Sequence, residues 1–351
     1  MIYMICPVFG KNNNAGTKAP NDINSISKDL GADIYMIKKC QPRRNFILWF
    51  FDYVDASQSW RKIIKEASAG DVLVYQYCSL FGKNALNIVK KSVRLLQQKN
   101  VRTVVLIHDL DSLRDPERYS QNDELGLIGS FDRIISHNES MTEFFVKNGF
   151  SKYNIVDLGI FDYLYEPDTG GSSNKSHGEK KTICFAGNLS RVKSAFLYEI
   201  AELNFDLDFN VYGSDLDSSL VSSNINYLGS FPPNEIPLKL KGDYGLVWDG
   251  KSLDKCDGRY GEYLKYNNPN KTSLYIAAGI PVIVWDQAAI AKFVLENHLG
   301  IAVSSLENIH EILENISEDE YKDMKENAER IGRKLREGYY FKTALYKAVN
   351  Y

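Results

Sequence analysis

The feature that most constrains the fold is an alternation of short apolar runs, rich in Val, Ile and Tyr, with amphipathic stretches. This alternation is typical of βαβ units around a parallel sheet. In the first half of the 351-residue chain, the segment from Lys83 to Gln98 has the period of a helix. The strands predicted there are 2–8, 33–37, 71–77, 103–108, 133–136 and 155–158. We therefore expect a first Rossmann-like domain.

A second series of the same kind begins after residue 180. Its predicted strands are 182–186, 208–212, 225–228, 244–248 and 282–285, and its predicted helices are 192–201, 271–278 and 288–296. Residues 168–179 contain no apolar side chain and have the small, polar composition of a linker. We predict an α/β protein in four parts: an N-terminal domain (1–167), a linker (168–180), a C-terminal domain (181–330) and a C-terminal helix packing on the first domain (331–351).

The composition excludes several classes of protein. A net charge of −3 argues against nucleic acid as the main partner, because binding to phosphates requires a basic face. The five cysteines include no C-x-x-C pair, and the first residues lack the charged and long apolar regions of a signal peptide. The longest apolar run, 46–51, is far short of the roughly 20 residues that span a bilayer. We expect a cytoplasmic protein.

A basic run, 38–44, precedes these apolar and aromatic residues. Such a segment more often belongs to a core or a subunit interface. The alternative is a peripheral contact with an anionic surface at the inner face of the membrane, or with a lipid-linked acceptor.

The most informative segment runs from Asn267 to Val284. Polar residues and a proline open a short helix, Gly279 ends it, and a buried strand follows. Such a helix start offers free amides and the positive end of the helix dipole to a diphosphate, and Lys271 in the first turn adds a full charge. We predict that Asn268 and Lys271 bind the substrate that carries this diphosphate, the donor of the group to be transferred. An ordinary crossover helix with a solvated lysine is the alternative.

Two more strand ends carry candidates for nucleotide binding. Arg191 enters a helix directly after the strand that ends in Gly187-Asn188, a position where ligands collect, and its guanidinium can grip a phosphate with two hydrogen bonds. Tyr212, beside Gly213 at the end of the next strand, is the candidate for stacking on uracil. A tyrosine that merely closes the core is an equal alternative.

The first domain offers a Gly- and Asn-rich turn at 9–17, which is no G-x-G-x-x-G and so disfavours a dinucleotide cofactor. Its amides can approach a phosphate or the donor sugar. His108 and Asp109 end a predicted strand, and an acceptor hydroxyl requires a general base there. The alternatives are an aspartate that caps the next helix and a structural histidine.

Three D-x-D triplets, at 109–111, 206–208 and 215–217, have the spacing that can hold a divalent metal on a diphosphate. They are weak signals in a chain with 45 acidic residues. A positive helix terminus together with Arg191 and Lys271 would make a metal unnecessary. We predict no metal and no cofactor, with the UDP-sugar as substrate.

Two segments carry a family resemblance: Gly261 to Lys271 (GEYLKYNNPNK) and Ala277 to Ile283 (AAGIPVI). They resemble bacterial galactofuranosyltransferases that form β-1,6 linkages, and equally glucosyltransferases that extend GlcNAc on serine-rich-repeat adhesins. The resemblance runs nearly end to end, and the other segments that fit it are 15–20, 135–138 and 188–191.

The resemblance implies a GT-B architecture, in which two Rossmann-like domains face a cleft and the second domain holds most of the donor. It implies that Arg191, Tyr212 and Lys271 bind UDP, and that Gly16 and Thr17 approach from the first domain. It also implies metal-independent transfer to a glycan acceptor and a homo-oligomer, as in the tetramers of the adhesin branch.

The function expected is transfer of glucose or galactofuranose from a UDP-sugar to GlcNAc-modified protein or a lipid-linked oligosaccharide. Many retaining relatives carry two glutamates eight residues apart, but Glu262 is followed at that distance by Asn270, which favours inversion. The alternatives are a non-catalytic GT-B subunit that binds glycans or a partner, because fold alone does not prove activity, and a UDP-sugar epimerase.

Overall fold

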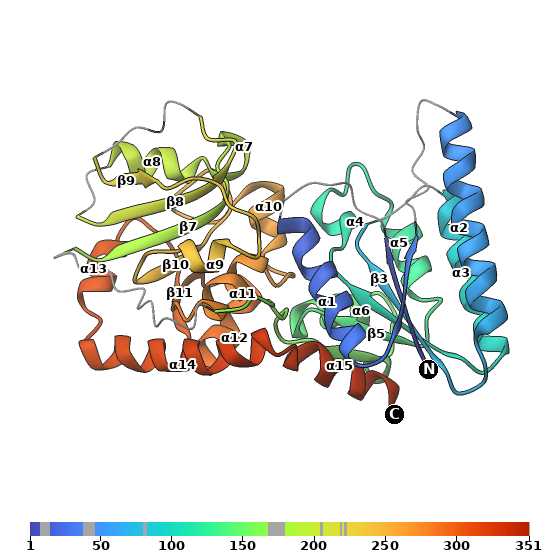
Figure 1. Ribbon diagram of the computed structural model, residues 1–351. Helices are drawn as coiled ribbons and strands as arrows, with labels where there is room; N and C mark the ends of the chain where they lie inside the picture. Colours follow the sequence, from blue (N-terminus) through green and yellow to red (C-terminus); the bar gives the residue numbers. More distant parts are fainter. Residues whose placement is uncertain are drawn as a thin grey trace. The chain divides into compact units, whose positions relative to one another are not determined.

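The computed structural model describes residues 1–7, 15–37, 46–79, 83–167, 180–203, 206–217, 220 and 223–350. The basic run 38–44, residues 9–14 of the predicted turn and nearly all of the predicted linker lie outside these residues. The chain divides into two compact units (Figure 1). Unit 1 comprises Met1–Asn12, Ala19–Leu158 and Phe341–Tyr351, and unit 2 comprises Asn13–Lys18 and Gly159–Tyr340.

Unit 1 is built on a parallel six-stranded sheet with the order β2-β1-β3-β4-β5-β6. Its strands are β1 (Ile2–Pro7), β2 (Asp33–Ile37), β3 (Val72–Tyr77), β4 (Arg102–Ile107), β5 (Arg133–Ser136) and β6 (Ile155–Asp157). Every residue of β3 is buried, as expected for a central strand covered on both faces. The order reverses between β1 and β3, which places a topological switch point there.

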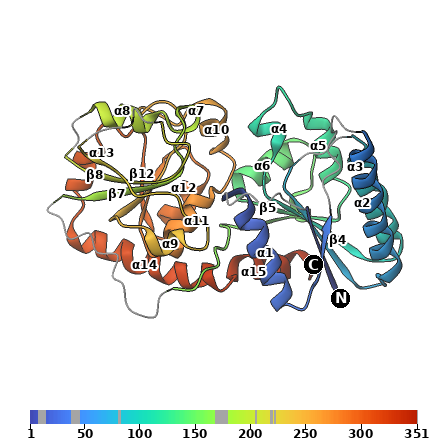
Figure 2. The same ribbon diagram turned by 45° about the horizontal axis from the view of Figure 1, so that its top comes forward.

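The helices of unit 1 connect these strands, and α2 and α3 lie side by side in both views (Figures 1 and 2). They are α1 (Lys18–Asp29), α2 (Phe46–Glu66), α3 (Lys83–Gln98), α4 (Asp111–Arg114), α5 (Gln121–Ile128) and α6 (Glu139–Lys147), with a short 3-10 turn η2 (Lys152–Asn154). The 3-10 turn η1 (Ala15–Thr17), which precedes α1, belongs to unit 2. The predicted apolar run 46–51 forms the start of α2. Among the described helices, none has both the length and the apolar character needed to cross a bilayer.

Unit 2 repeats the architecture with a second parallel sheet of order β12-β11-β10-β7-β8-β9, whose switch point lies between β10 and β7. Its strands are β7 (Thr182–Asn188), β8 (Asp208–Ser214), β9 (Ile225–Tyr227), β10 (Tyr244–Val247), β11 (Val282–Trp285) and β12 (Gly300–Val303). β12 was not among the predicted strands. The two parallel sheets with connecting helices confirm the predicted pair of Rossmann-like domains, with one strand more than predicted in the second.

The helices of unit 2 include one departure from the sequence prediction. The single helix expected at 192–201 is two, α7 (Arg191–Ser194) and α8 (Phe196–Glu202). The others are α9 (Ile236–Lys239), α10 (Gly258–Tyr263), α11 (Asn270–Ala277), α12 (Ile290–Glu296), α13 (Ile309–Glu314) and α14 (Glu318–Arg336), and α15 (Tyr339–Val349) follows.

The end of the chain is divided between the units. Gly338, with a φ of 72°, separates α14 from α15. Ile331 and Leu335 of α14 are buried in the core of unit 2, whereas residues from Phe341 onward belong to unit 1, where Arg102 donates to the Val349 carbonyl. The predicted C-terminal segment 331–351 therefore begins ten residues too early.

The contacts change from unit 1 to unit 2 at 158/159, before the predicted boundary at 167/168. Tyr163 donates its hydroxyl to the Pro233 carbonyl oxygen at 2.7 Å, and Tyr165 donates to the Ala277 carbonyl oxygen at 3.0 Å. These hydrogen bonds hold the segment after Leu158 on unit 2, although its sequence continues the first domain without a break in composition.

Candidate functional site

The carboxyl ends of β7 and β8 come very close together in unit 2. Gly187 of β7 pairs with Gly213 of β8, and a Cβ on Gly213 would lie 1.7 Å from the Gly187 carbonyl oxygen. A Cβ on Gly187 would in turn lie 3.0 Å from Cε of Lys271. Gly213 therefore lets the two strand ends approach, and Gly187 makes room for the lysine side chain.

Lys271 lies in the first turn of α11, beside the switch point of the sheet. Its ammonium donates to Oδ1 of Asp249 at 2.7 Å and to the Trp248 carbonyl oxygen at 3.1 Å, and it lies 4.6 Å from the centre of the Phe185 ring. Its side chain is only 13% exposed. Burial lowers the pKa of Lys271 and Asp249 opposes that shift, while neighbouring Lys193 lowers the pKa further. Lys271 and Asp249 thus form a largely buried ion pair at this edge of the sheet.

The first turn of α11 also contains donors that the sequence prediction missed. Pro269 occupies the N-cap position and provides no side-chain hydrogen bond to the helix. Thr272 and Ser273 are buried, and their hydroxyls have no hydrogen-bond partner among the described residues. The sequence signal that could have indicated them is a pair of hydroxyl residues directly after Lys271 in an otherwise apolar helix.

Arg191 is the first residue of α7, and it lies shortly after the end of β7. Its guanidinium lies 4.1 Å from the centre of the Tyr198 ring, and its Nε is 3.4 Å from Oδ2 of Asp217. Its side chain is 52% exposed. The carbonyl of nearby Lys193 accepts from the amide of Gly250, which connects α7 to the segment that carries Asp249.

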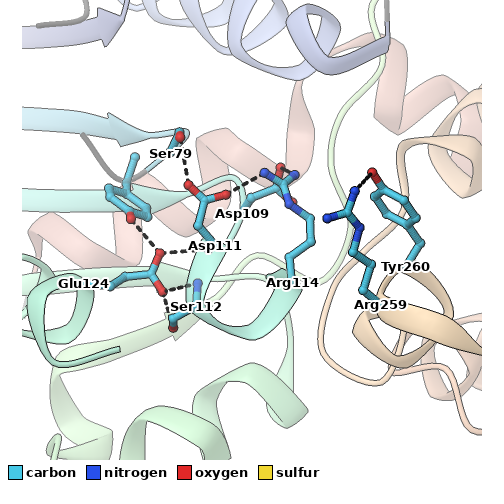
Figure 3. Close-up of polar contacts among 9 residues, drawn as sticks. Ser79, Asp109, Asp111, Ser112, Arg114, Glu124, Arg259 and Tyr260 are labelled. Atoms are coloured by element: carbon cyan, nitrogen blue, oxygen red, sulfur yellow. Dashed lines mark hydrogen bonds and ion pairs between the residues drawn. The ribbon is translucent and has the colours of Figure 1, made fainter. Parts of the chain in front are cut away.

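Two further cations of this edge share one aromatic ring that the sequence prediction did not single out. The Nζ of Lys193 lies 4.9 Å, and the guanidinium carbon of Arg259 lies 4.8 Å, from the centre of the Tyr260 ring. Arg259 also donates to the Tyr260 hydroxyl at 3.0 Å (Figure 3). Unit 2 therefore gathers Arg191, Lys193, Arg259 and Lys271 on α7, α10 and α11.

The stacking role predicted for Tyr212 is wrong. The side chain is 1% exposed, and its hydroxyl donates to the Lys239 carbonyl at 3.0 Å and accepts from the Lys241 amide at 2.9 Å. A ring closed off in this way has no free face for a base. Tyr212 does lie at the end of β8, as predicted. Its side chain points into the core, where the segment around α9 covers it.

Asn268 and the η1 turn hold structural contacts. Asn268 is 3% exposed and donates from Nδ2 to the Gly159 carbonyl at 3.0 Å, within unit 2. Gly16 is exposed and Thr17 half-buried. The next residue, buried Lys18, donates to the Leu164 carbonyl and lies over the Tyr163 ring, which groups this turn with unit 2.

In unit 1, the two candidate bases at the end of β4 differ in access. His108 is 9% exposed, its Nε2 lies 2.9 Å from Oε1 of Gln76, and burial lowers its pKa to about 3. A buried, neutral histidine of such low basicity is poorly suited to accept a proton from an acceptor hydroxyl. The Asp109 side chain is 32% exposed and is the better candidate.

Asp109 belongs to an ion-pair cluster (Figure 3). Arg114 donates from Nη1 to Oδ2 of Asp109 at 2.8 Å and from Nη2 to Oδ1 of Asp111 at 2.5 Å, and Ser79 donates to the other oxygen of Asp111 at 2.7 Å. The first D-x-D triplet is thus bridged by an arginine. Within the described part of the chain, no three His, Cys, Asp or Glu side chains are grouped to hold a metal ion.

Comparison with known proteins decides the family. Residues 2–160 match the N-terminal domain, and residues 183–348 the C-terminal domain, of the glucosyltransferase 3-like family. The chain belongs to the glucosyltransferase 3-like family. It is 36% identical over 283 residues to the β-1,6-galactofuranosyltransferase WbbI of Escherichia coli K12, covering 80% of this chain and 79% of that one.

The other matches of this glucosyltransferase 3-like protein agree with that assignment. Glucosyltransferase 3 of Streptococcus gordonii is 28% identical over 338 residues, covering 94% of this chain and 93% of that one. Among solved structures, the apo lipopolysaccharide outer core galactosyltransferase WaaB is similar with a TM-score of 0.63 at 10% identity, over 99% of both chains. The protein is a glycosyltransferase with the GT-B fold, and the family resemblance stated from its sequence is confirmed.

Proposed function

We propose that this protein transfers a hexose, glucose or galactofuranose, from a UDP-sugar to a glycan acceptor, with no metal ion and no further cofactor. The observation that carries the proposal is the Lys271 site. A buried ammonium, a helix N-terminus and two buried hydroxyls without partners lie at the switch point of the unit 2 sheet. This is the place in an open parallel sheet where ligands bind.

The chemistry of the site suits a departing nucleoside diphosphate. Lys271 and Arg191 provide two positive charges, and Thr272 and Ser273 can donate hydrogen bonds to phosphate oxygens. A fixed positive environment of low polarity stabilises the negative charge that develops on the leaving group. Divalent metal ions fill this role in other enzymes. We propose that Lys271 and Arg191, which are paired with Asp249 and Asp217 in this structure, turn to the diphosphate and fill it here.

We propose Asp109 as the general base that deprotonates the acceptor hydroxyl, and inversion at the anomeric carbon as the outcome. Glu262 forms an ion pair with Lys265 at 2.7 Å, and the residue eight positions later is Asn270. The glutamate pair of many retaining relatives is therefore missing at this spacing. Direct attack by an activated hydroxyl needs only one base.

The relatives' names suggest the acceptor class. WbbI is a β-1,6-galactofuranosyltransferase and the streptococcal relative a glucosyltransferase, names that give the sugar class and no acceptor. From the family resemblance we propose a GlcNAc-modified protein or a lipid-linked oligosaccharide as acceptor. We further propose that the protein works in the cytoplasm as a homo-oligomer, a tetramer in the first instance, and contacts the inner face of the membrane peripherally where the acceptor is lipid-linked.

Calorimetric titration with UDP, GDP, CDP and NAD, in EDTA and again with magnesium, tests the donor site. We expect UDP alone to bind tightly, with the same affinity in both buffers. Lys271→Ala and Arg191→Ala should each weaken UDP binding by about 1 to 3 kcal/mol, the range for losing a charge-assisted hydrogen bond. Lys322→Ala, an exposed lysine on α14, is the matched control and should bind like the wild type.

Unchanged UDP affinity in both variants would place the donor elsewhere. Absence of UDP binding in either buffer would favour a non-catalytic subunit that recognises glycans. A sugar epimer formed from the UDP-sugar without an acceptor would indicate an epimerase instead.

A further inference from the structure

Glu124, on α5 of unit 1, is a fully buried carboxylate with four hydrogen-bond donors around it (Figure 3). Its Oε1 accepts from the Tyr77 hydroxyl at 2.6 Å and from the Asp111 amide at 2.8 Å. Its Oε2 accepts from the Ser112 amide at 3.0 Å and from the Ser112 hydroxyl at 2.5 Å. Burial raises the pKa of Glu124, and the hydrogen bonds from Ser112 and Tyr77 oppose that shift.

These contacts show what the carboxylate does for the neighbouring helix. Asp111 and Ser112 form the first turn of α4, and the N-cap residue Leu110 has no side-chain oxygen to satisfy their amides. Glu124 reaches across from α5 and accepts from both. It therefore caps α4 from outside the helix, at the end where a negative charge also complements the helix dipole.

A four-residue helix has no stability of its own, so α4 depends on such contacts. Its last residue is Arg114, whose guanidinium reaches back to Asp111, three residues earlier, and to Asp109, five residues earlier. That reach requires the intervening backbone to stay folded as a helix. The hydrogen bonds thus form a continuous chain from Tyr77 in the core through Glu124 and α4 to Arg114 and Asp109.

We infer that Glu124 is a positioning residue: by capping α4 it holds Arg114 against Asp109 and so fixes the orientation of the catalytic base. This inference rests on the proposed role of Asp109. Glu124 is fully buried among the described residues, so it acts on the acceptor only through α4 and Arg114.

Glu124→Gln tests the inference because it keeps the shape of the side chain and replaces one acceptor oxygen by a donor that faces N–H or O–H groups. We expect kcat to fall by roughly tenfold or more, since misplacing a catalytic group is costly. The KM for the UDP-sugar and the affinity for UDP should stay within about twofold, because the proposed donor site lies in unit 2. Glu143→Gln on α6, at a 61% exposed carboxylate, is the matched control.

A double-mutant cycle separates positioning from general stability. If Glu124 acts through Arg114, the substitution Glu124→Gln should change kcat by less than about twofold in the Arg114→Gln background. If instead the double variant loses kcat by the product of the two single-variant factors, the inference is overturned. Tyr77→Phe removes one of the four donors without placing a new donor against the carboxylate, and should lower kcat by a smaller factor with an unchanged KM.

The failure of this inference and that of the proposed base are distinguishable. If Asp109→Asn is inactive while Glu124→Gln has wild-type kcat, the inference is overturned and the base assignment stands. If Asp109→Asn has wild-type kcat, the base assignment itself fails and the role of Glu124 falls with it. If Glu124→Gln does not fold, wild-type kcat in Tyr77→Phe overturns the inference.

Discussion

His108 and His137 show how much depends on the surroundings of a single side chain. His108 follows β4 and His137 follows β5, and both are buried. Burial lowers the pKa of His108 to about 3 and that of His137 to about 4. A strand-end histidine looks like a candidate base in a sequence, because the depth at which the following loop covers it cannot be read from the residue type.

The lowered histidine pKa values predict acid sensitivity. The unfolded chain takes up a proton near the ordinary pKa of 6.5, whereas folded His108 stays neutral until about pH 3. The contribution of neutral His108 to the free energy of unfolding is therefore fully present above pH 6.5, and it is lost as the pH falls from there toward 3. Between pH 7 and 5, His108 alone should remove about 2 kcal/mol from the free energy of unfolding.

Urea unfolding at pH 7 and pH 5 measures this loss. His108→Gln should show a smaller pH-dependent decrease than the wild type by that amount, while His298→Gln, at a 72% exposed histidine, should leave the decrease unchanged. An equal decrease in wild type and His108→Gln would show that His108 does not stay neutral in the folded protein.

The residues proposed to bind the donor differ in how well the sequence indicates them. Lys271 and Arg191 could be proposed from the sequence because a cation at the start of a helix after a buried strand has an unfavourable interaction with the helix dipole. Tyr212 was misread, because the direction of an aromatic side chain at a strand end depends on the segment packed over it. Thr272 and Ser273 were missed because buried hydroxyls in a helix usually bond to the preceding turn.

At the scale of elements, β7 and β8 are joined by a contact that only glycine permits. Gly213 has a φ of 147° and its missing Cβ would overlap the Gly187 carbonyl oxygen. Gly213→Ala should therefore lower the free energy of unfolding by roughly 3 kcal/mol or more, through strain and overpacking together. Gly31→Ala is the matched control, since Gly31 also has a positive φ of 76° but open space around it.

Denaturant unfolding followed by circular dichroism compares the two variants. Gly31→Ala should lower the free energy of unfolding by only about 1 to 2 kcal/mol, because it adds backbone strain without overpacking. A loss in Gly213→Ala no larger than in Gly31→Ala would mean that the two strand ends do not approach as closely as described.

Most elements were predictable because their periodicity is strong. β2, β5, β11 and α3 have the predicted bounds. The division of the helix at Ala195 was not predictable from the local period, because α7 has a contact that is distant in sequence: the Lys193 carbonyl accepts from the Gly250 amide. The Ser194 hydroxyl also donates to the nearby Asn188 carbonyl at 2.7 Å.

At the scale of the whole molecule, the two Rossmann-like domains followed from the strand and helix periods of the sequence. The GT-B architecture and the family followed from the resemblance of residues 261–271 and 277–283 to known glycosyltransferases. The unit boundary did not. Composition marks the polar segment 168–179, whereas the contacts change at 158/159, where Asn268, Tyr163 and Tyr165 begin to hold the chain on unit 2. A change in packing partner leaves no trace in composition.

The measurement that tests the central claim most directly is sugar transfer itself. The purified protein is incubated in EDTA with UDP-glucose or UDP-galactofuranose and a GlcNAc-terminated acceptor, and the acceptor is followed by mass spectrometry. We predict that the acceptor gains one hexose from a UDP-sugar, that the corresponding GDP-sugar gives no product, and that Lys271→Ala reduces the rate. Transfer that requires added magnesium, or that proceeds at full rate in Lys271→Ala, would contradict it.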